Sequence, residues 1–375
     1  MKEGKPLGGK VLTKPFMFLL FVSLVAAYFL ARRFIFGLGD VTGMNDGYPW
    51  GIWIAYDVVV GTAFACGGYA LALLIYVMNK RQYSPLLRPA ILASMFGYSL
   101  AGVSVFFDVG RYWQMYNIFL PGYGNVNSVL FEVALCIGIY TLVLWIEFTP
   151  TFLTRLGADK VQATLNKLMF FFIALGILLP TMHQSSLGTL MVIAGSKLHP
   201  LWWTARLPLL FLISSVLLGF AAVIFESSIS TLRLKTIDEN HLLDQLARLF
   251  PWIIAAYLLV RFGDIVYRGH TGLLFIGDSH SLMFLIENLL YLLPAVFLAM
   301  PKTRQSRKAL FFCALSLMLA GGLYRFNCFI IQFDPGNGWH YFPKAGEIWI
   351  TLGIIAVEIM GYLFFIKKLP VLRRA

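Results

Sequence analysis

Charged residues are scarce in this chain. Asp, Glu, Lys and Arg make up 13% of its 375 residues, whereas 59% are hydrophobic, and the mean hydropathy is +0.76. A soluble domain does not need so much apolar surface, so the composition excludes an ordinary soluble enzyme. No segment of low complexity is present.

Cysteine and histidine are also sparse. The four cysteines, Cys66, Cys136, Cys313 and Cys328, form no CxxC, so they cannot hold an iron–sulfur cluster at the usual spacing. We interpret them as small buried packing residues. Of six histidines, only His183 lies clearly within an apolar run, and a haem held between two histidines needs a pair of them on helices. The sequence predicts no haem, no iron–sulfur cluster and no bound metal.

Long apolar runs dominate what is present. About 20 consecutive apolar residues span a bilayer as a helix. We therefore expect an all-α integral membrane protein forming one membrane domain, 1–375, with two helical bundles, 1–187 and 200–375. The first run is too long for a signal peptide, so we expect it to be retained. The ten predicted spans are 15–37, 52–78, 88–109, 128–149, 166–187, 203–226, 248–267, 281–300, 308–331 and 347–366.

The net charge of +12 follows the predicted topology. Most basic residues precede the first run, follow every second run, or end the chain. Because such residues stay in the cytoplasm, we expect both termini there and no nucleic-acid partner. The basic residues of the two terminal segments include Lys2, Lys5, Lys10, Lys14, Lys367, Lys368, Arg373 and Arg374, and Lys235 lies in one of the connections.

Four ionisable residues from separate spans are predicted to lie at a similar depth. Asp57, Asp108, Glu132 and His183 all fall near the outer ends of their spans, and Tyr98 lies near the middle of the third. Buried ionisable groups are costly in a bilayer and usually mark a functional site. An acid, a histidine and a tyrosine in one pocket suit a quinone, whose reduction requires hydrogen-bond donors and two protons.

Structural alternatives exist for several of these residues. Asp108 and Arg111 are three residues apart and could pair with each other. Pro180 frees a carbonyl near His183, so the histidine and its polar neighbours could serve helix packing instead. Six residues of the second half could form a proton path or Arg–carboxylate pairs between helices: Glu226, Arg261, Asp264, Glu287, Arg325 and Glu358.

The predicted outer connections are rich in Gly, Pro, Asn and aromatic residues. They cover about 38–51, 110–127, 188–202, 268–280 and 332–346. Part of this pattern is typical of an aromatic belt at the membrane interface. The loops are long enough to form a docking surface for a partner, which is the interpretation we favour.

Several ordered motifs carry a family resemblance over almost the whole chain. They include PWGIWIAYD (49–57), GTAFACGGYALA (61–72), DVGRYW (108–113), NVNSVLFE (125–132), LPTMHQSS (179–186) and RFGDIVYR (261–268). With these motifs the chain resembles the membrane subunits of periplasm-facing Hyb-type nickel–iron hydrogenases, in the NrfD/polysulfide reductase superfamily.

The resemblance implies a function and a set of partners. Such subunits reduce menaquinone without haem, with electrons from a periplasmic ferredoxin-like iron–sulfur subunit docked on the outer face of the bacterial inner membrane. Nickel–iron large and small subunits oxidise hydrogen, and lipid surrounds the spans.

The same resemblance assigns site residues. Glu132 and His183 become the proton-transfer candidates, and Asp57, Tyr98, Glu132 and His183 the quinone-binding residues. Trp50, Asp108 and Arg111 are added as further residues near the quinone.

Two other functions remain open from the sequence. A related membrane protein could anchor a molybdopterin enzyme and oxidise quinol. An ion-coupled transporter could use the same buried carboxylates, although its polar groups would be expected at broken helices near the midplane.

Overall fold

The computed structural model describes residues 6–234 and 238–372, and within them it confirms ten membrane-length helices. Lys2, Lys5, Lys235, Arg373 and Arg374, which the topology prediction used, lie outside the described residues. The ten spans are α1 (Lys14–Phe36), a broken second span (Trp53–Val77), α5 (Ser84–Asp108), α6 (Val129–Leu156), α7 (Asp159–Ala194), α8 (Leu207–Leu234), α10 (Phe250–Tyr267), α11 (Ser279–Ala299), α13 (Arg307–Phe326) and α14 (Ala345–Lys368).

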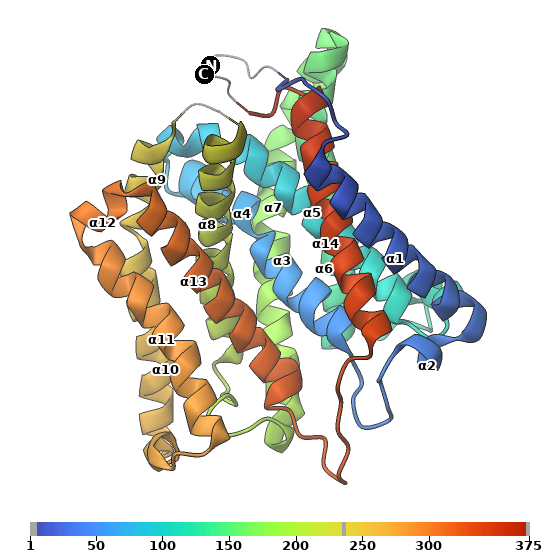
Figure 1. The fold of residues 1–375 in the computed structure, drawn as a ribbon, viewed down its shortest axis with the longest axis vertical. Helices are drawn as coiled ribbons and strands as arrows, with labels where there is room; N and C mark the ends of the chain where they lie inside the picture. The colour runs from blue at the N-terminus through green and yellow to red at the C-terminus, as the bar shows by residue number, and fades with distance from the viewer. Residues whose placement is uncertain (1–5, 235–237, 373–375) are drawn as a thin grey trace.

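The first and last spans lie side by side. α14 packs along α1 and also against α5 (Figure 1). The backbone amides of Leu7 and Gly8 donate to the carbonyls of Ile366 and Lys367, so both ends of the described chain lie on one side of the bundle. We refer to this side as the termini side and to the other as the loop side. The division into two bundles stays a prediction, and α14, from the second, packs with helices of the first.

The second span is not one continuous helix. It consists of a π-helical segment (Trp53–Val60), α3 (Gly61–Phe64), a turn, α4 (Gly67–Ala72) and a second π-helical segment (Leu73–Val77). At the turn, a Cβ on Gly219 of α8 would stand 2.5 Å from the carbonyl oxygen of Cys66. The break therefore fits α8 only because residue 219 has no side chain.

The loop side contains more helix than expected. α7 continues to Ala194 and a 3₁₀ turn follows (Gly195–Lys197), so the predicted loop at 188–202 begins later than expected. Another 3₁₀ segment (Tyr112–Phe119) lies inside the predicted loop 110–127 and exposes Trp113, Tyr116 and Phe119. Short 3₁₀ helices need little sequence signal, which explains why the pattern missed them.

The carboxylate of Glu347 joins three loop-side segments. Its Oε2 accepts from the backbone amides of Gly43 (2.7 Å) and Lys344 (2.9 Å), and its Oε1 accepts from the Tyr341 hydroxyl (2.6 Å). The Tyr341 hydroxyl in turn accepts from the amide of Ile52 (2.8 Å). Glu347 therefore fixes the entry of the second span against the start of α14.

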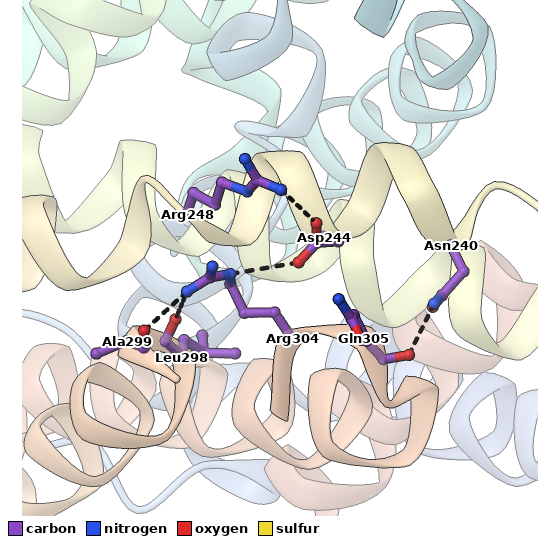
Figure 2. A network of polar contacts seen from close by, with 7 residues as sticks. All are labelled: Asn240, Asp244, Arg248, Leu298, Ala299, Arg304 and Gln305. Carbon is purple, nitrogen blue, oxygen red and sulfur yellow. Dashed lines mark hydrogen bonds and ion pairs between the residues drawn. The ribbon is translucent and has the colours of Figure 1, made fainter. Parts of the chain in front are cut away.

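On the termini side, two short helices are joined by a polar network. They are α9 (Asn240–Ala247) and α12 (Pro301–Gln305). Asp244 accepts from Arg248 (2.9 Å) and Arg304 (3.3 Å), and Arg304 also donates to the carbonyls of Leu298 and Ala299 at the end of α11 (Figure 2). These contacts hold α9 on the ends of the neighbouring spans.

Candidate functional site

A cavity of about 490 Å³ lies between the broken second span, α5, α8, α13 and α14. Most of its wall is apolar, from residues such as Ala93, Met318 and Ile355. Its polar lining consists of Tyr56, Asp57, Ser94, Glu226, Ser230, Glu358 and Tyr362. Three of these were predicted, for two different sites. Asp57 was expected in a first-half pocket, whereas Glu226 and Glu358 were expected on a second-half path.

Asp57 is held by hydroxyl groups and keeps one oxygen free. It lies in the first π-helical segment and is 5% exposed. Its Oδ2 accepts from the Ser104 hydroxyl (3.0 Å) and the Thr351 hydroxyl (3.4 Å), while its Oδ1 has no hydrogen-bond partner among the described residues. π-Helical turns are frequent at functional sites. The free oxygen gives the carboxyl group a position at which it can exchange a proton with a ligand.

The other two cavity carboxylates lie progressively deeper. Asp57 is four residues from the loop-side end of its span. Glu358 is 13 residues from the start of α14, about 20 Å along the helix, and Glu226 is 19 residues into α8, about 28 Å along. Tyr362 donates a hydrogen bond to Glu226. The cavity therefore carries carboxyl groups from near the loop side toward the termini side.

His183 and Tyr98 belong to a packed polar chain rather than to the cavity lining. The His183 ring is 1% exposed, and its Nε2 lies 3.0 Å from the hydroxyl of Thr62. The Gln184 amide nitrogen donates to Thr62 (3.1 Å), and its Oε1 accepts from Arg325 (3.2 Å). The sequence did not predict Thr62 as a partner of His183, or Gln184 as the link between Thr62 and Arg325, because these contacts join spans that are distant in the sequence.

Tyr98 is packed against aromatic rings. Its ring centroid lies 4.5 Å from Tyr140 and 5.8 Å from His183, and its hydroxyl lies 3.7 Å from the Cys66 sulfur. Because Tyr98 is fully buried and does not line the cavity, the expected contact of His183 and Tyr98 with one open pocket is not found.

The remaining first-half candidates lie toward the loop side and outside the cavity lining. Glu132 is half-buried in the first turn of α6, where its charge suits the helix N-terminus. Trp50 donates from its indole to the carbonyl of Phe329 (2.7 Å). Arg111 is exposed and makes no ion pair with Asp108 in the part of the chain that is described, so that structural alternative is wrong. Of the four ionisable residues expected to converge, only Asp57 lines the cavity.

Three second-half candidates form ion pairs, and one of these pairs joins two helices. Arg261 of α10 pairs with Glu287 of α11, and both are buried. Glu287 Oε2 also accepts from the Trp202 indole (2.8 Å) and the Asn327 amide (2.5 Å). Asp264 pairs instead with Arg206 (2.5 Å) and Arg268 (2.6 Å). These contacts support the helix-joining interpretation for Arg261, Asp264 and Glu287.

Arg325 differs from Arg261 because it forms no ion pair with a carboxylate of the described residues. It is fully buried and donates to the Gln184 amide, to the Ser214 hydroxyl (3.1 Å) and to the carbonyl of Phe211 (3.3 Å). Its Nε has no hydrogen-bond partner among the described residues. The packed chain that begins at His183 therefore ends at a buried positive charge.

Two histidines stack on the loop side. The rings of His199 and His280 lie 4.3 Å apart at an interplanar angle of 10°. His199 Nδ1 accepts from the Leu201 amide (3.3 Å), and His280 Nδ1 lies 2.6 Å from Gln332 Oε1. Burial, and next the neighbouring His280, lower the pKa of His199 below its ordinary value.

Comparison with known proteins gives a consistent assignment. The family model described as "Polysulphide reductase, NrfD" matches residues 40–332. The chain is 47% identical over 373 residues to the "Probable Ni/Fe-hydrogenase 2 b-type cytochrome subunit" of Escherichia coli (strain K12), covering 99% of this chain and 95% of the relative. It is 27% identical over 395 residues to the "Menaquinone reductase, integral membrane subunit" of Nitratidesulfovibrio vulgaris, covering 95% and 90%. It is 21% identical over 414 residues to a selenate reductase subunit of Mesobacillus selenatarsenatis, covering 96% and 94%.

The expectation that the chain works without haem is corrected by these findings. The relative that is 47% identical is named a b-type cytochrome subunit, which implies a haem. Among the described residues, His183 is the histidine deep within a span, and its Nε2 faces Thr62. His199 and His280 stack too closely for an iron between their rings. Neither His183 nor the stacked pair of His199 and His280 therefore fits a bis-histidine haem site.

Proposed function

Because the chain belongs to the polysulphide reductase NrfD family of membrane subunits, we propose that it reduces a quinone of the menaquinone class within a hydrogen-oxidising complex. The cavity that contains Asp57, Glu358 and Glu226 carries this proposal. Two relatives support the proposal. The one at 47% identity is named as a Ni/Fe-hydrogenase subunit, and the one at 27% identity is named as a menaquinone reductase subunit.

The cavity suits the two parts of a quinone. Its volume of about 490 Å³ exceeds that of a naphthoquinone ring system, and its apolar wall suits the first isoprenoid units. Several lining residues, such as Ile229 and Ile359, are exposed on the lipid-facing surface, which gives a tail a way out to the bilayer. Asp57 supplies the polar contact to the ring, since its Oδ1 is free.

Quinone reduction consumes two electrons and two protons, and it converts two carbonyl groups into hydroxyl groups. We assign the electrons to an iron–sulfur partner docked on the loop side, and the hydrogen oxidation to nickel–iron large and small subunits. The protons pass through carboxyl groups, first Asp57 and behind it Glu358 and Glu226. We place the loop side in the periplasm and the protein in a bacterial inner membrane, following the distribution of basic residues.

The other site candidates keep their proposed roles outside the cavity. The Nδ1 atom of His183 has no hydrogen-bond partner among the described residues, and the Glu132 carboxyl group is half-buried, so we keep both as proton-transfer candidates. Tyr98 accompanies His183 in the packed chain. Trp50, Asp108 and Arg111 lie toward the proposed docking surface.

A molybdopterin-enzyme anchor is the second candidate. The selenate reductase relative at 21% identity favours it. Neighbouring genes discriminate the two, because the hydrogenase version requires genes for a nickel–iron large subunit and a ferredoxin-like protein.

Binding of a fluorescent quinol analogue, 2-heptyl-4-hydroxyquinoline N-oxide, tests the site. The purified chain is expected to quench the fluorescence at a stoichiometry near one. Ala93→Trp fills the cavity and is expected to abolish quenching, whereas Ala27→Trp, on the exposed face of α1, leaves it unchanged. Equal quenching by both variants would place the quinone elsewhere.

A further inference from the structure

A second, smaller hollow lies directly behind Glu226. It has about 20 Å³ of space, enough for about one water molecule. Glu226 and Ser230 line both this hollow and the large cavity, and Ser227 and Glu239 add polar groups. The hollow therefore continues the series of carboxyl groups toward the termini side.

The end of the described chain covers this hollow. After α14 ends, Leu369 adopts an extended conformation, and Pro370 cannot continue the helix. Val371 and Leu372 turn inward, are 4% and 8% exposed, and line the hollow opposite the start of α5. The amides of Leu7 and Gly8 hold the preceding turn of α14 in place.

The facing wall is held by a different set of contacts. Glu239 is the residue that precedes α9, and the network of Figure 2 fixes this helix on α11 and α12. Asp238, the next residue back, pairs with Arg307. One wall of the hollow is thus secured by ion pairs, whereas the cover consists of a few apolar side chains.

We propose that protons enter from the termini side through this hollow, between Glu239 and Glu226, and that Val371 and Leu372 form its cover. The proposal rests on the proposed quinone reduction, for which it names the proton source. A hydrated proton that enters the hollow gives its proton to the Glu226 carboxylate and leaves as water, and one proton then passes from the Glu226 acid to the cavity. Glu226 is therefore unchanged after each transfer, and the apolar cover keeps bulk water out.

Thiol labelling tests the cover without any quinone assay. Ser227→Cys places a near-isosteric reporter in the hollow, and the four native cysteines are buried. A small methanethiosulfonate reagent is applied to the purified chain in detergent. In the reporter background, Leu372→Gly is expected to raise the labelling rate at least about tenfold by opening the cover. Leu369→Gly is the matched control, because Leu369 is equally buried but does not line the hollow. Equal labelling rates for the two variants would overturn the proposal that Leu372 covers the hollow.

Proton entry needs a second measurement in the intact complex. Leu372→Trp fills the hollow and is expected to slow hydrogen-linked quinone reduction and to raise its solvent deuterium isotope effect. Dye-linked hydrogen oxidation and the thermal unfolding midpoint should match those of the wild type. An unchanged rate and isotope effect would overturn the proton route. A wild-type complex without quinone reduction would instead refute the proposed function, while the labelling experiment still decides the cover.

Discussion

Gly219 of α8 lies directly against the carbonyl of Cys66, at the turn where the second span breaks. The contact joins the middle of two spans by their backbones. In sequence, Cys66 stands between Ala65 and Gly67, which both line the cavity.

Gly219→Ala should destabilise the protein. The added Cβ would meet the Cys66 carbonyl at 2.5 Å, and the neighbouring backbone must shift, which typically costs about 1–3 kcal/mol. Gly138→Ala in α6 is the control, because nothing lies within 4 Å of its Cβ position. Thermal unfolding in detergent should show a lower midpoint for the first variant and no loss for the second.

Asp57→Asn should separate the two activities of the complex. The side-chain oxygen of an asparagine can still accept hydrogen bonds from the Ser104 and Thr351 hydroxyls, but the amide cannot exchange a proton. Quinone-linked hydrogen oxidation should therefore fall about 100-fold. Dye-linked hydrogen oxidation should persist. Asp40→Asn, which alters an aspartate paired with Arg32 outside the cavity, should change neither rate. Full quinone activity in the Asp57 variant would remove this carboxyl group from the mechanism.

Glu132→Gln tests the proposed proton role of a residue outside the cavity. Quinone-linked hydrogen oxidation should be lost, and dye-linked oxidation should remain, because the substitution removes a titratable group and keeps its size. The carboxylate makes no ion pair among the described residues, so the unfolding midpoint should stay close to that of the wild type. Unchanged quinone reduction would refute the role.

Glu287→Gln should strongly destabilise the second half. It leaves the buried Arg261 without its counter-charge, which typically costs about 3–5 kcal/mol. Asp40→Asn is the comparison, since Asp40 pairs with the partly exposed Arg32, and such pairs contribute about 0–1 kcal/mol. Similar unfolding midpoints for the two variants would contradict the importance of the buried pair.

Acid should reduce the stability of the fold through His199, which stacks on His280 on the loop side. Its lowered pKa means that the unfolded chain takes up a proton more readily than the folded one. The contribution to stability is therefore intact above the ordinary histidine pKa of about 6.5 and is lost as the pH falls toward the lowered value. His280 and His270 favour this loss, whereas Asp278 opposes it.

The comparison of wild type with His199→Asn measures this effect. The asparagine can still accept from the Leu201 amide but carries no titratable ring. Between pH 7.5 and 5.5, the unfolding midpoint of the wild type should drop more than that of the variant. Equal drops would exclude His199 as the source of the acid sensitivity.

The ten spans could be predicted from the sequence, but the break within the second span and its contact with α8 could not. Apolar length alone predicts ten helices, because a bilayer demands it. The break at Ala65 and Cys66 has no such signal, since GTAFACGG contains no charged residue and no proline. The broken span fits α8 because Gly219, more than 150 residues away, has no side chain.

The site was predictable in its residue types but not in its grouping. Asp57, Glu226 and Glu358 stood out as carboxyl groups inside apolar runs, yet the cavity that joins them depends on how α8 and α14 pack. The sequence allowed Arg–carboxylate pairs between helices but not the choice of partners: Arg261 pairs with Glu287 of α11, and Asp264 pairs with Arg206 and Arg268. Glu347 was missed, although Lys344 and Glu347 have the spacing of a capping box.

The packing of α14 against α1 has a consequence for biosynthesis. Glu358 and Tyr362 both lie on α14, so the wall of the cavity is incomplete until the last span has left the ribosome and inserted. The first span, inserted long before, must remain in the bilayer without its neighbour during the synthesis of the other eight. A chain arrested before α14 would accordingly be inserted through most of its length and yet lack both the cavity wall and the partner of its first helix.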